Sequence, residues 1–343
     1  MNFKDVTLNI SEEDYRQLPY INYSLLKTIN DFGPLGFEEY NKSRSSSALS
    51  FGTLVDTMVT NKDNLDNIFY SKDIQSPTAS LLILANALLQ ENIIEELEYD
   101  KLTSDDNLLK KAKSLNLWSK MSDDVILSKI KNDLFFTYIK ESINARGKII
   151  LDEETRKSIE YCANTLLTHN ITKDLFIEQE NIEVIKQAIL IYNYKEQQCK
   201  AKLDLIRVDH KNKIIYPYDI KTGSDFPSNF NNAFYYWKYY IQVISYMLSI
   251  YYIISTIEEF KDYTVADFQF IYISKKLPET PVIYTVENKL LNYFYDGWTT
   301  RSGDKIKGFN ELFDDCVYYM TNDIYTTERK IIENKSALKI ELL

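Results

Sequence analysis

Two short segments of the chain contain the residue types best suited to chemistry. They read Lys202-Leu203-Asp204 and Asp219-Ile220-Lys221. Side chains at positions i and i+2 of a β-strand point to the same face, so Asp219 and Lys221 are expected side by side. Two neighbouring carboxylates can share a hard divalent cation, and an adjacent lysine can orient a water molecule or stabilise charge on a phosphate oxygen. The pattern predicts a metal-dependent hydrolytic site, although an Asp and a Lys at this spacing are more often a solvated strand face.

The turn between the two segments decides whether Asp204 and Asp219 can meet. Residues 209–212, Asp-His-Lys-Asn, have turn chemistry. If the hairpin turns symmetrically about the His-Lys pair, Lys202 faces Asp219. Asp204 is then the diagonal neighbour of Asp219, with about 7–8 Å between their backbones. A loop of three residues would turn Asp204 to the opposite face, so the metal site requires a loop of two or four residues.

Two helical segments carry further polar side chains. Gln242 and Tyr246 lie four residues apart in an aromatic run and are expected on one side of a helix. In the segment Gly-Thr-Leu-Val-Asp at 52–56, Asp56 is a single carboxylate among apolar residues, and its burial is costly unless it is paired or metal-bound. Each feature also has a structural interpretation. Gln242 and Tyr246 can form a polar notch in a core helix, and Asp56 can simply face water.

The elements that must position these residues follow from hydrophobic periodicity. The first third of the chain has helical spacing, and the pattern changes to β-type after Asn181. In the strand expected at 199–209, we place Ala201, Leu203 and Leu205 on one face and Lys202, Asp204 and Ile206 on the other. The other expected elements are strands at 187–192, 214–222, 268–274 and 281–286, with a long helix at about 231–255. The prediction is an α/β fold with a small mixed sheet flanked by helices and a helical N-terminal half.

Composition limits the class of protein. The chain has 343 residues and a formal net charge of −10, which argues against a protein that coats nucleic acid nonspecifically. Its three cysteines lie far apart and it has two histidines, so a disulfide scaffold, a zinc ribbon and a four-cysteine iron–sulfur cluster are not expected. The apolar run 241–257 is interrupted by polar residues and is shorter than the roughly 20 residues that a bilayer requires. With no apolar signal segment at the N-terminus, we expect a cytoplasmic protein without a membrane partner.

One segment of the chain has a positive net charge, although the chain as a whole is acidic. Between residues 195 and 221 there are seven lysine or arginine side chains and four carboxylates. A local excess of positive charge can bind phosphates even when the whole chain is acidic. Three aromatic residues, Trp237, Tyr239 and Tyr240, could stack on unpaired bases, although most aromatic residues of their helix are expected in the core.

Taken together, these segments resemble the PD-(D/E)XK nuclease superfamily, specifically the phage and prophage exonucleases like RecE (exonuclease VIII), which are related to the RecB nuclease domain. Segment 48–56 is similar to the "LxFGTxxH" helix of that family, and 239–246 is similar to its QxxxY motif. No single segment is specific, but six occur in the family's order. They are 20–27, 48–56, 147–150, 202–204, 219–222 and 239–246.

The resemblance implies a restriction-endonuclease-like core with a defined set of site residues. The implied metal ligands are Asp56, Asp204, Asp219 and Ile220. The implied catalytic residues are Asp204, Asp219, Lys221, Gln242 and Tyr246. The implied substrate-binding residues are Lys202, Thr222, Trp237, Lys238 and Ser46. The chain departs from the family at Asp56, where a histidine is usual, but an oxygen ligand suits magnesium as well or better. It also departs at Gln187, where a glutamate is common, and the loss of that carboxylate puts a second metal or full activity in doubt.

The function implied by the resemblance is an exonuclease that uses Mg²⁺, or Mn²⁺ in its place, to hydrolyse duplex DNA from its ends in phage-type recombination. A single-strand annealing protein and further copies of this chain are the implied partners. Two alternatives remain open: a non-catalytic protein that binds DNA ends or a partner on a decayed nuclease fold, and a structure-specific endonuclease. The expected organisation is an N-terminal part of the core at 1–60, a helical insertion at 61–146, the nuclease core at 147–300 and a mostly helical extension at 301–343.

Overall fold

The computed structural model describes residues 1–45, 51–61, 69–71, 76–95, 98–145, 148–151 and 153–336. Contacts between residues divide the chain into two compact units. The first comprises residues 1–61 and 162–343, and the second comprises residues 62–161. The four-part organisation expected from the sequence stays a prediction. Among the described residues, no helix combines the length and apolar character that crossing a membrane requires.

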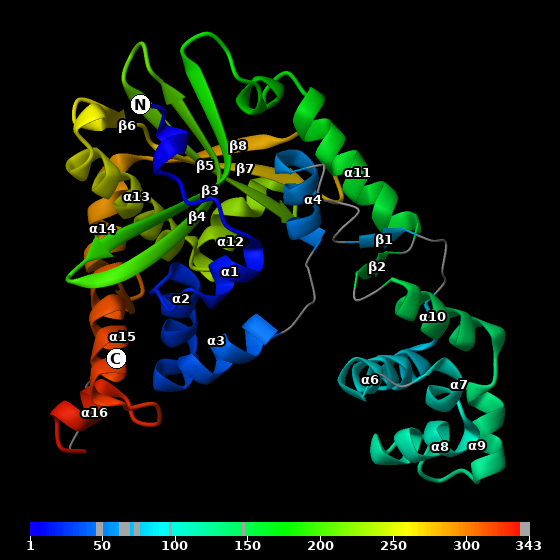
Figure 1. The fold of residues 1–343 in the computed structure, drawn as a ribbon. Helices are drawn as coiled ribbons and strands as arrows, with labels where there is room; N and C mark the ends of the chain where they lie inside the picture. Colours follow the sequence, from blue (N-terminus) through cyan, green and yellow to red (C-terminus); the bar gives the residue numbers. More distant parts are fainter. Residues whose placement is uncertain are drawn as a thin grey trace. The chain divides into compact units, whose positions relative to one another are not determined.

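A mixed sheet organises the first unit (Figure 1). Its strands run in the order β3-β4-β5-β7-β8, and β6 pairs with β5 outside this path. The pairs β3–β4, β4–β5 and β7–β8 are antiparallel, whereas β5 is parallel to both β6 and β7. The strand bounds are β3 (Ile182–Tyr194), β4 (Gln197–Asp209), β5 (Ile214–Gly223), β6 (Thr264–Val265), β7 (Phe268–Ser274) and β8 (Val282–Val286). The expected mixed α/β architecture is therefore present.

Two helices make the crossover that a parallel pair of strands requires. The chain leaves β5, forms α12 (Phe230–Tyr236) and α13 (Tyr239–Thr256), and returns through β6 to β7. Helix α13 packs against β3 and β4 and against α2 (Tyr23–Phe32). Eleven of its side chains are buried, because its sequence is apolar on nearly every face. This helix fills the core under the sheet and brings Gln242 and Tyr246 to the inside.

The remaining elements of the first unit precede and follow the sheet. Those before it are η1 (Phe3–Val6), α1 (Glu12–Gln17), α2, η2 (Gly33–Leu35), α3 (Gly36–Ser45), α4 (Phe51–Thr60) and η4 (Lys173–Phe176). Those within or after it are η5 (Pro227–Asn229), η6 (Glu258–Phe260), η7 (Asn288–Leu290), α14 (Leu291–Asp296), β9 (Gly297–Thr299), β10 (Lys305–Lys307), α15 (Phe309–Asn322) and α16 (Arg329–Glu333). Helix α4 contacts β5 and β4.

The strand alternation predicted for β4 is wrong beyond Leu203. Core residues of β4 are odd-numbered up to Leu203 and then even-numbered from Ile206, while Leu205 is buried outside this cluster. Strand β3 changes in the same place, between Ile185 and Ala188. The reason is Gln187, whose backbone has a φ of 53°, a left-handed conformation that interrupts the regular pleat. In both strands, therefore, the alternation of core-facing and outward-facing side chains reverses near Gln187 and Asp204.

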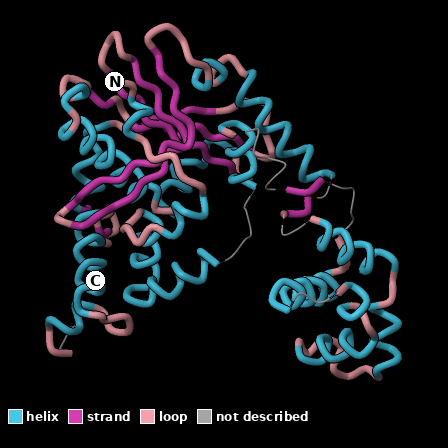
Figure 2. The backbone as a smooth tube through the Cα atoms, viewed as in Figure 1, coloured by secondary structure: helices cyan, strands magenta, loops and turns pink. Residues whose placement is uncertain are grey.

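The second unit is mainly helical (Figure 2). It has its own hydrophobic core. Its fully buried residues include Leu84, Leu88, Leu108, Phe135 and Ile139. Its elements are α6 (Ala79–Glu95), α7 (Tyr99–Leu102), α8 (Asp105–Ser114), α9 (Asp123–Ile130), α10 (Asp133–Asn144) and the parallel pair β1 (Phe69–Ser71) and β2 (Ile149–Leu151). Helix α11 (Glu153–Thr168) begins in this unit and ends in the first.

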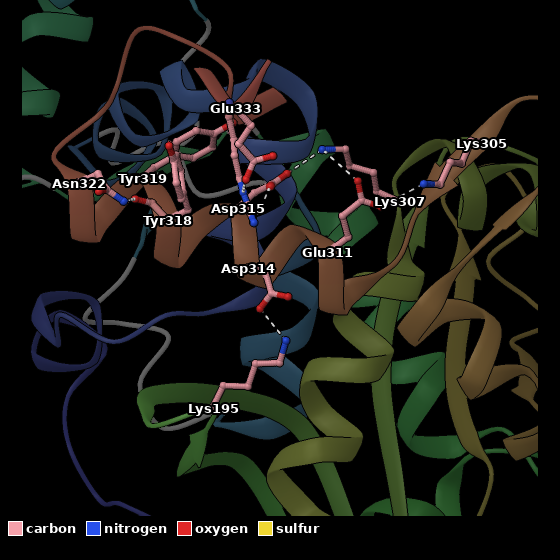
Figure 3. Close-up of polar contacts among 11 residues, drawn as sticks. Lys195, Lys305, Lys307, Glu311, Asp314, Asp315, Tyr318, Tyr319, Asn322 and Glu333 are labelled. Carbon is pink, nitrogen blue, oxygen red and sulfur yellow. Dashed lines mark hydrogen bonds and ion pairs between the residues drawn. The ribbon is translucent and has the colours of Figure 1, made fainter. Parts of the chain in front are cut away.

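A charged cluster joins the last elements of the first unit (Figure 3). Asp315 of α15 is buried and pairs with Lys307 of β10 at 2.6 Å and with Arg329 of α16 at 3.5 Å. A neighbouring pair, Lys195 with Asp314, has an N···O distance of 2.6 Å but is well exposed to solvent. The buried pairing fixes β10 and α16 to α15.

Candidate active site

The β4–β5 hairpin brings the two predicted carboxylates together. Its register pairs Leu205 with Tyr218 and Asp209 with Ile214, which leaves a loop of four residues at 210–213. One further step along the strands places Asp204 opposite Asp219. The predicted register was wrong by two residues, so Lys202 does not face Asp219. Because the shift is even, the expected common face of the two carboxylates is preserved.

Asp219 is the most constrained of the acidic residues. Its side chain is buried, with 1% of the residue exposed. Lys221, two positions along β5, places its Nζ 2.5 Å from one carboxylate oxygen, and Gln242 Nε2 of α13 donates a 2.6 Å hydrogen bond to the other. Burial alone would lower the pKa of Lys221, but the adjacent Asp219 raises it above its usual value, so the lysine stays protonated.

Asp204 lies just beyond the end of the paired part of β4 and β5, whose last pair is Leu205 with Tyr218. Its Oδ2 accepts a 2.7 Å hydrogen bond from the backbone N–H of Ile220. Burial and the nearby carboxylates of Asp56 and Asp219 raise the pKa of Asp204 well above its ordinary value. The structure thus holds three carboxyl groups, those of Asp56, Asp204 and Asp219, close enough that their negative charges repel one another.

Asp56 approaches the same place from helix α4. Gln187 Nε2 donates a 2.6 Å hydrogen bond to its Oδ2, whereas its Oδ1 is buried and has no hydrogen-bond partner. Burial, offset in part by Lys202 and Gln187, raises the pKa of Asp56 to about 7. The solvent-facing alternative for Asp56 is therefore wrong. A buried carboxylate with an unpaired oxygen is costly unless another group binds it.

Gln187 is the strained residue of the site. It lies in β3 at the position opposite Asp204, because the pairs on either side are Lys186 with Leu205 and Ala188 with Leu203. Its positive φ is rare for a residue with a side chain and costs on the order of 1 kcal/mol. The strained backbone turns the amide of Gln187 toward Asp56.

These side chains line one cavity of about 690 Å³ in the first unit. Five basic and four acidic side chains line it, a local excess of one positive charge in a chain whose net charge is −10. The tyrosines at its wall include Tyr23 of α2 and Tyr246 of α13, which pack edge to face at 5.6 Å between ring centroids. The cavity is therefore polar and partly aromatic, with basic and acidic side chains in nearly equal numbers.

The structure places most of the predicted site residues at this cavity. Those that line it are Asp56, Lys202, Asp204, Asp219, Ile220, Lys221, Thr222 and Tyr246. Gln242 is not a lining residue but donates a hydrogen bond to Asp219. Lys202 of β4 lies opposite Ile189 of β3. Its Nζ forms an ion pair with a carboxylate oxygen of Glu12 at 2.5 Å. Trp237 and Lys238 are not among the lining residues and lie at the junction of α12 and α13. Ser46 lies outside the described residues.

Several lining residues were not predicted. They are Glu12, Tyr15, Arg16, Asn22, Lys200, Tyr239 and Lys275, together with others of α2 and α4. Lys200 could have been found from the sequence, because a lysine in the apolar part of a strand is unusual. Its ammonium is buried and donates to the backbone oxygens of Tyr15 and Leu18 at 2.7 Å each. It holds the end of α1 at the rim of the cavity.

The donor set has the chemistry that a hard divalent cation requires. Carboxylate oxygens are preferred ligands of Mg²⁺, and Asp56 has a buried oxygen without a hydrogen-bond partner. Across the described parts of the chain, however, no three His, Cys, Asp or Glu side chains are already grouped as a metal centre. Each carboxylate is turned instead to a protein donor: Gln187, the Ile220 N–H or Lys221.

The comparisons with known proteins find structural likenesses but no sequence match. No protein-family model matches the chain, and no curated protein matches it. Among solved structures, the chain is similar to one described as "Putative exonuclease" from Eubacterium rectale, with 13% sequence identity and a TM-score of 0.44. The likeness covers 98% of this chain and 97% of that one. At this identity and TM-score it supports no statement about activity, so the functional conclusion depends on the site.

Proposed function

We propose that this protein is a magnesium-dependent nuclease of the PD-(D/E)XK type that hydrolyses DNA from duplex ends. The observation that carries the proposal is the meeting of Asp56, Asp204 and Asp219 with Lys221 at one polar cavity. Three separate elements supply the carboxylates: α4, β4 and β5. Clustered buried carboxylates destabilise a fold through mutual repulsion, and their usual explanation is a function that needs them.

The residues of the site divide into ligands and positioning groups. Asp56, Asp204 and Asp219 would hold the cation. When bound, Mg²⁺ supplies Lewis-acid polarisation of the phosphodiester and lowers the pKa of a bound water. Gln242 fixes one oxygen of Asp219, and Gln187 fixes one oxygen of Asp56. The second oxygen of Asp219 is paired with Lys221, whereas that of Asp56 has no hydrogen-bond partner.

Lys221 is best suited to stabilise charge. A lysine whose pKa is raised keeps its proton at neutral pH and cannot act as a general base. Its ammonium can instead contact a non-bridging phosphate oxygen and stabilise the negative charge that grows there in the transition state. The excess of basic over acidic side chains at the cavity supports the same anionic substrate. The partners that follow are duplex DNA ends, with a single-strand annealing protein and further copies of this chain as additional proposals.

The proposal is tested with linear and covalently closed circular forms of one plasmid, with and without Mg²⁺ at fixed salt. We expect nucleotide release from the linear form alone, and only with the metal. Lys221→Ala serves as the inactive control. Equal degradation of both forms would replace the exonuclease with a structure-specific endonuclease.

The second candidate is a protein that binds DNA ends or a partner without cutting. The direct Lys221–Asp219 ion pair and the glutamine at position 187 favour it, since both reduce the free negative charge available to a metal. Isothermal titration with Mg²⁺ and Mn²⁺ separates the two candidates. Binding heat in the wild type that disappears in Asp204→Asn supports the nuclease, and no heat in either protein supports the binding protein.

A further inference from the structure

Two neighbouring aromatic side chains are exposed where α12 meets α13. Tyr236 is 74% exposed and Trp237 is 49% exposed. Their rings pack edge to face, with 4.8 Å between centroids. Single exposed apolar residues are ordinary, but adjacent large aromatic rings on the surface commonly mark a binding site. The pair is therefore unusual enough to need an explanation.

The backbone at the junction is arranged to expose this pair. Lys238 separates the two helices and has a φ of 58°, a strained conformation for a residue with a side chain. The side chain of Lys238 forms an ion pair with Asp31 of α2, which holds the strained residue in place. On the other side of the break, Tyr239 lines the cavity and Tyr240 is buried. The break thus turns Trp237 outward while the next residues turn inward.

Helix α2 connects this aromatic pair to the cavity. Tyr23 and Ser24 of α2 line the cavity, and Lys27 lies one helical turn farther along. The ammonium of Lys27 is 6.0 Å from the centre of the Trp237 ring. Lys27 and Lys238 both pair with Asp31, so two cations share one carboxylate and leave a positive charge beside the rings.

We propose that Tyr236, Trp237, Lys27 and Lys238 form a stacking platform that receives the unpaired bases of a DNA end and leads the strand to the cavity. The proposal rests on the proposed function and specifies its substrate as an end with unpaired nucleotides. Aromatic rings stack on any base, and neighbouring lysines bind the phosphates of the same strand. An apolar protein segment could also contact the two rings, but it carries no negative charge to interact with Lys27 and Lys238.

The platform is tested by binding in EDTA, where no metal-dependent cleavage occurs. The probe is a fluorescein-labelled DNA hairpin with a short single-stranded overhang, and the matched probe carries abasic nucleotides in the overhang. Both have the same phosphates, so their difference measures the bases alone. The variants are the double change Tyr236→Ala with Trp237→Ala, the conservative Trp237→Phe, and Tyr293→Ala. Tyr293 is 59% exposed on α14 and is the control for losing an exposed ring.

We expect the wild type to bind the base-containing overhang about tenfold more tightly than the abasic one. The double variant should lose this difference, while Trp237→Phe and Tyr293→Ala keep it. Equal affinity of the wild type for the two probes overturns the platform, and so does an unchanged difference in the double variant. Base-dependent binding without Mg²⁺-dependent cleavage overturns the proposed nuclease alone. Cleavage without base-dependent binding overturns the platform alone.

Discussion

Asp204 and Asp219 have the same side chain but different surroundings, and this difference can be measured. Asp204 accepts one backbone hydrogen bond beside other carboxylates, whereas Asp219 neutralises the buried ammonium of Lys221. Asp204→Asn removes repulsion and retains an acceptor, so thermal stability should stay equal or rise. Asp219→Asn leaves the Lys221 charge without its partner and should lower the free energy of unfolding by about 1–3 kcal/mol. Both variants should lose nuclease activity by at least about a hundredfold, which thermal melting together with a nuclease assay would check.

Gln187 decides how many negative charges the site contains. Gln187→Glu adds a carboxylate next to Asp56 in place of the amide that now donates to it. Like charges repel at this range, so the variant should melt below the wild type when no metal is present. Mg²⁺ should then raise its melting temperature more than it raises that of the wild type. An equal Mg²⁺ response in both proteins would show that position 187 does not face the cation.

At the scale of elements, the fold depends on a few polar contacts that join helices to the sheet. The clearest is Asp315 of α15, which neutralises Lys307 and Arg329 from two other elements (Figure 3). Asp315→Ala should lower the free energy of unfolding by about 1–3 kcal/mol, because it removes the buried carboxylate that both cations share and leaves each with only its more exposed partner, Glu311 or Glu333. The measurement is urea denaturation.

Asp314 provides the matched control for this cluster. It lies on the same helix and pairs with Lys195 at 2.6 Å, but 43% of its side chain is exposed. Asp314→Ala should change stability by less than about 1 kcal/mol, since water screens an exposed pair. Similar losses in both variants would mean that burial does not determine the strength of these pairs.

At the scale of the whole molecule, the two units have separate hydrophobic cores. Leu203 is fully buried in the core of the first unit, and Leu88 is fully buried in that of the second. Proteins with two cores commonly depart from two-state unfolding. Each Leu→Ala change should cost about 2–5 kcal/mol and should shift a different part of the calorimetric transition. A single transition lowered equally by both changes would show that the units unfold together.

Much of the site was determined by residue types and strand geometry. The two-residue spacing of Asp219 and Lys221 placed them on one face of β5, and the four-residue spacing of Gln242 and Tyr246 placed both inside α13. These relations hold because strand and helix periodicity are local properties of the backbone. Strand alternation also showed that Asp204 and Asp219 share a face only if the hairpin loop has two or four residues, but it did not decide the length of that loop.

Only the tertiary structure decided the remaining relations. The hairpin register depends on the whole β4–β5 pairing, and the change of face at Leu203 depends on the left-handed backbone of Gln187. The hydrogen bond from Gln187 to Asp56 joins residues 131 positions apart, and local periodicity carries no signal for such a contact. The exposure of Tyr236 and Trp237 likewise follows from a single strained residue, Lys238, held by a charge on another helix. Long-range packing chooses these conformations because it outweighs the local preference of each residue.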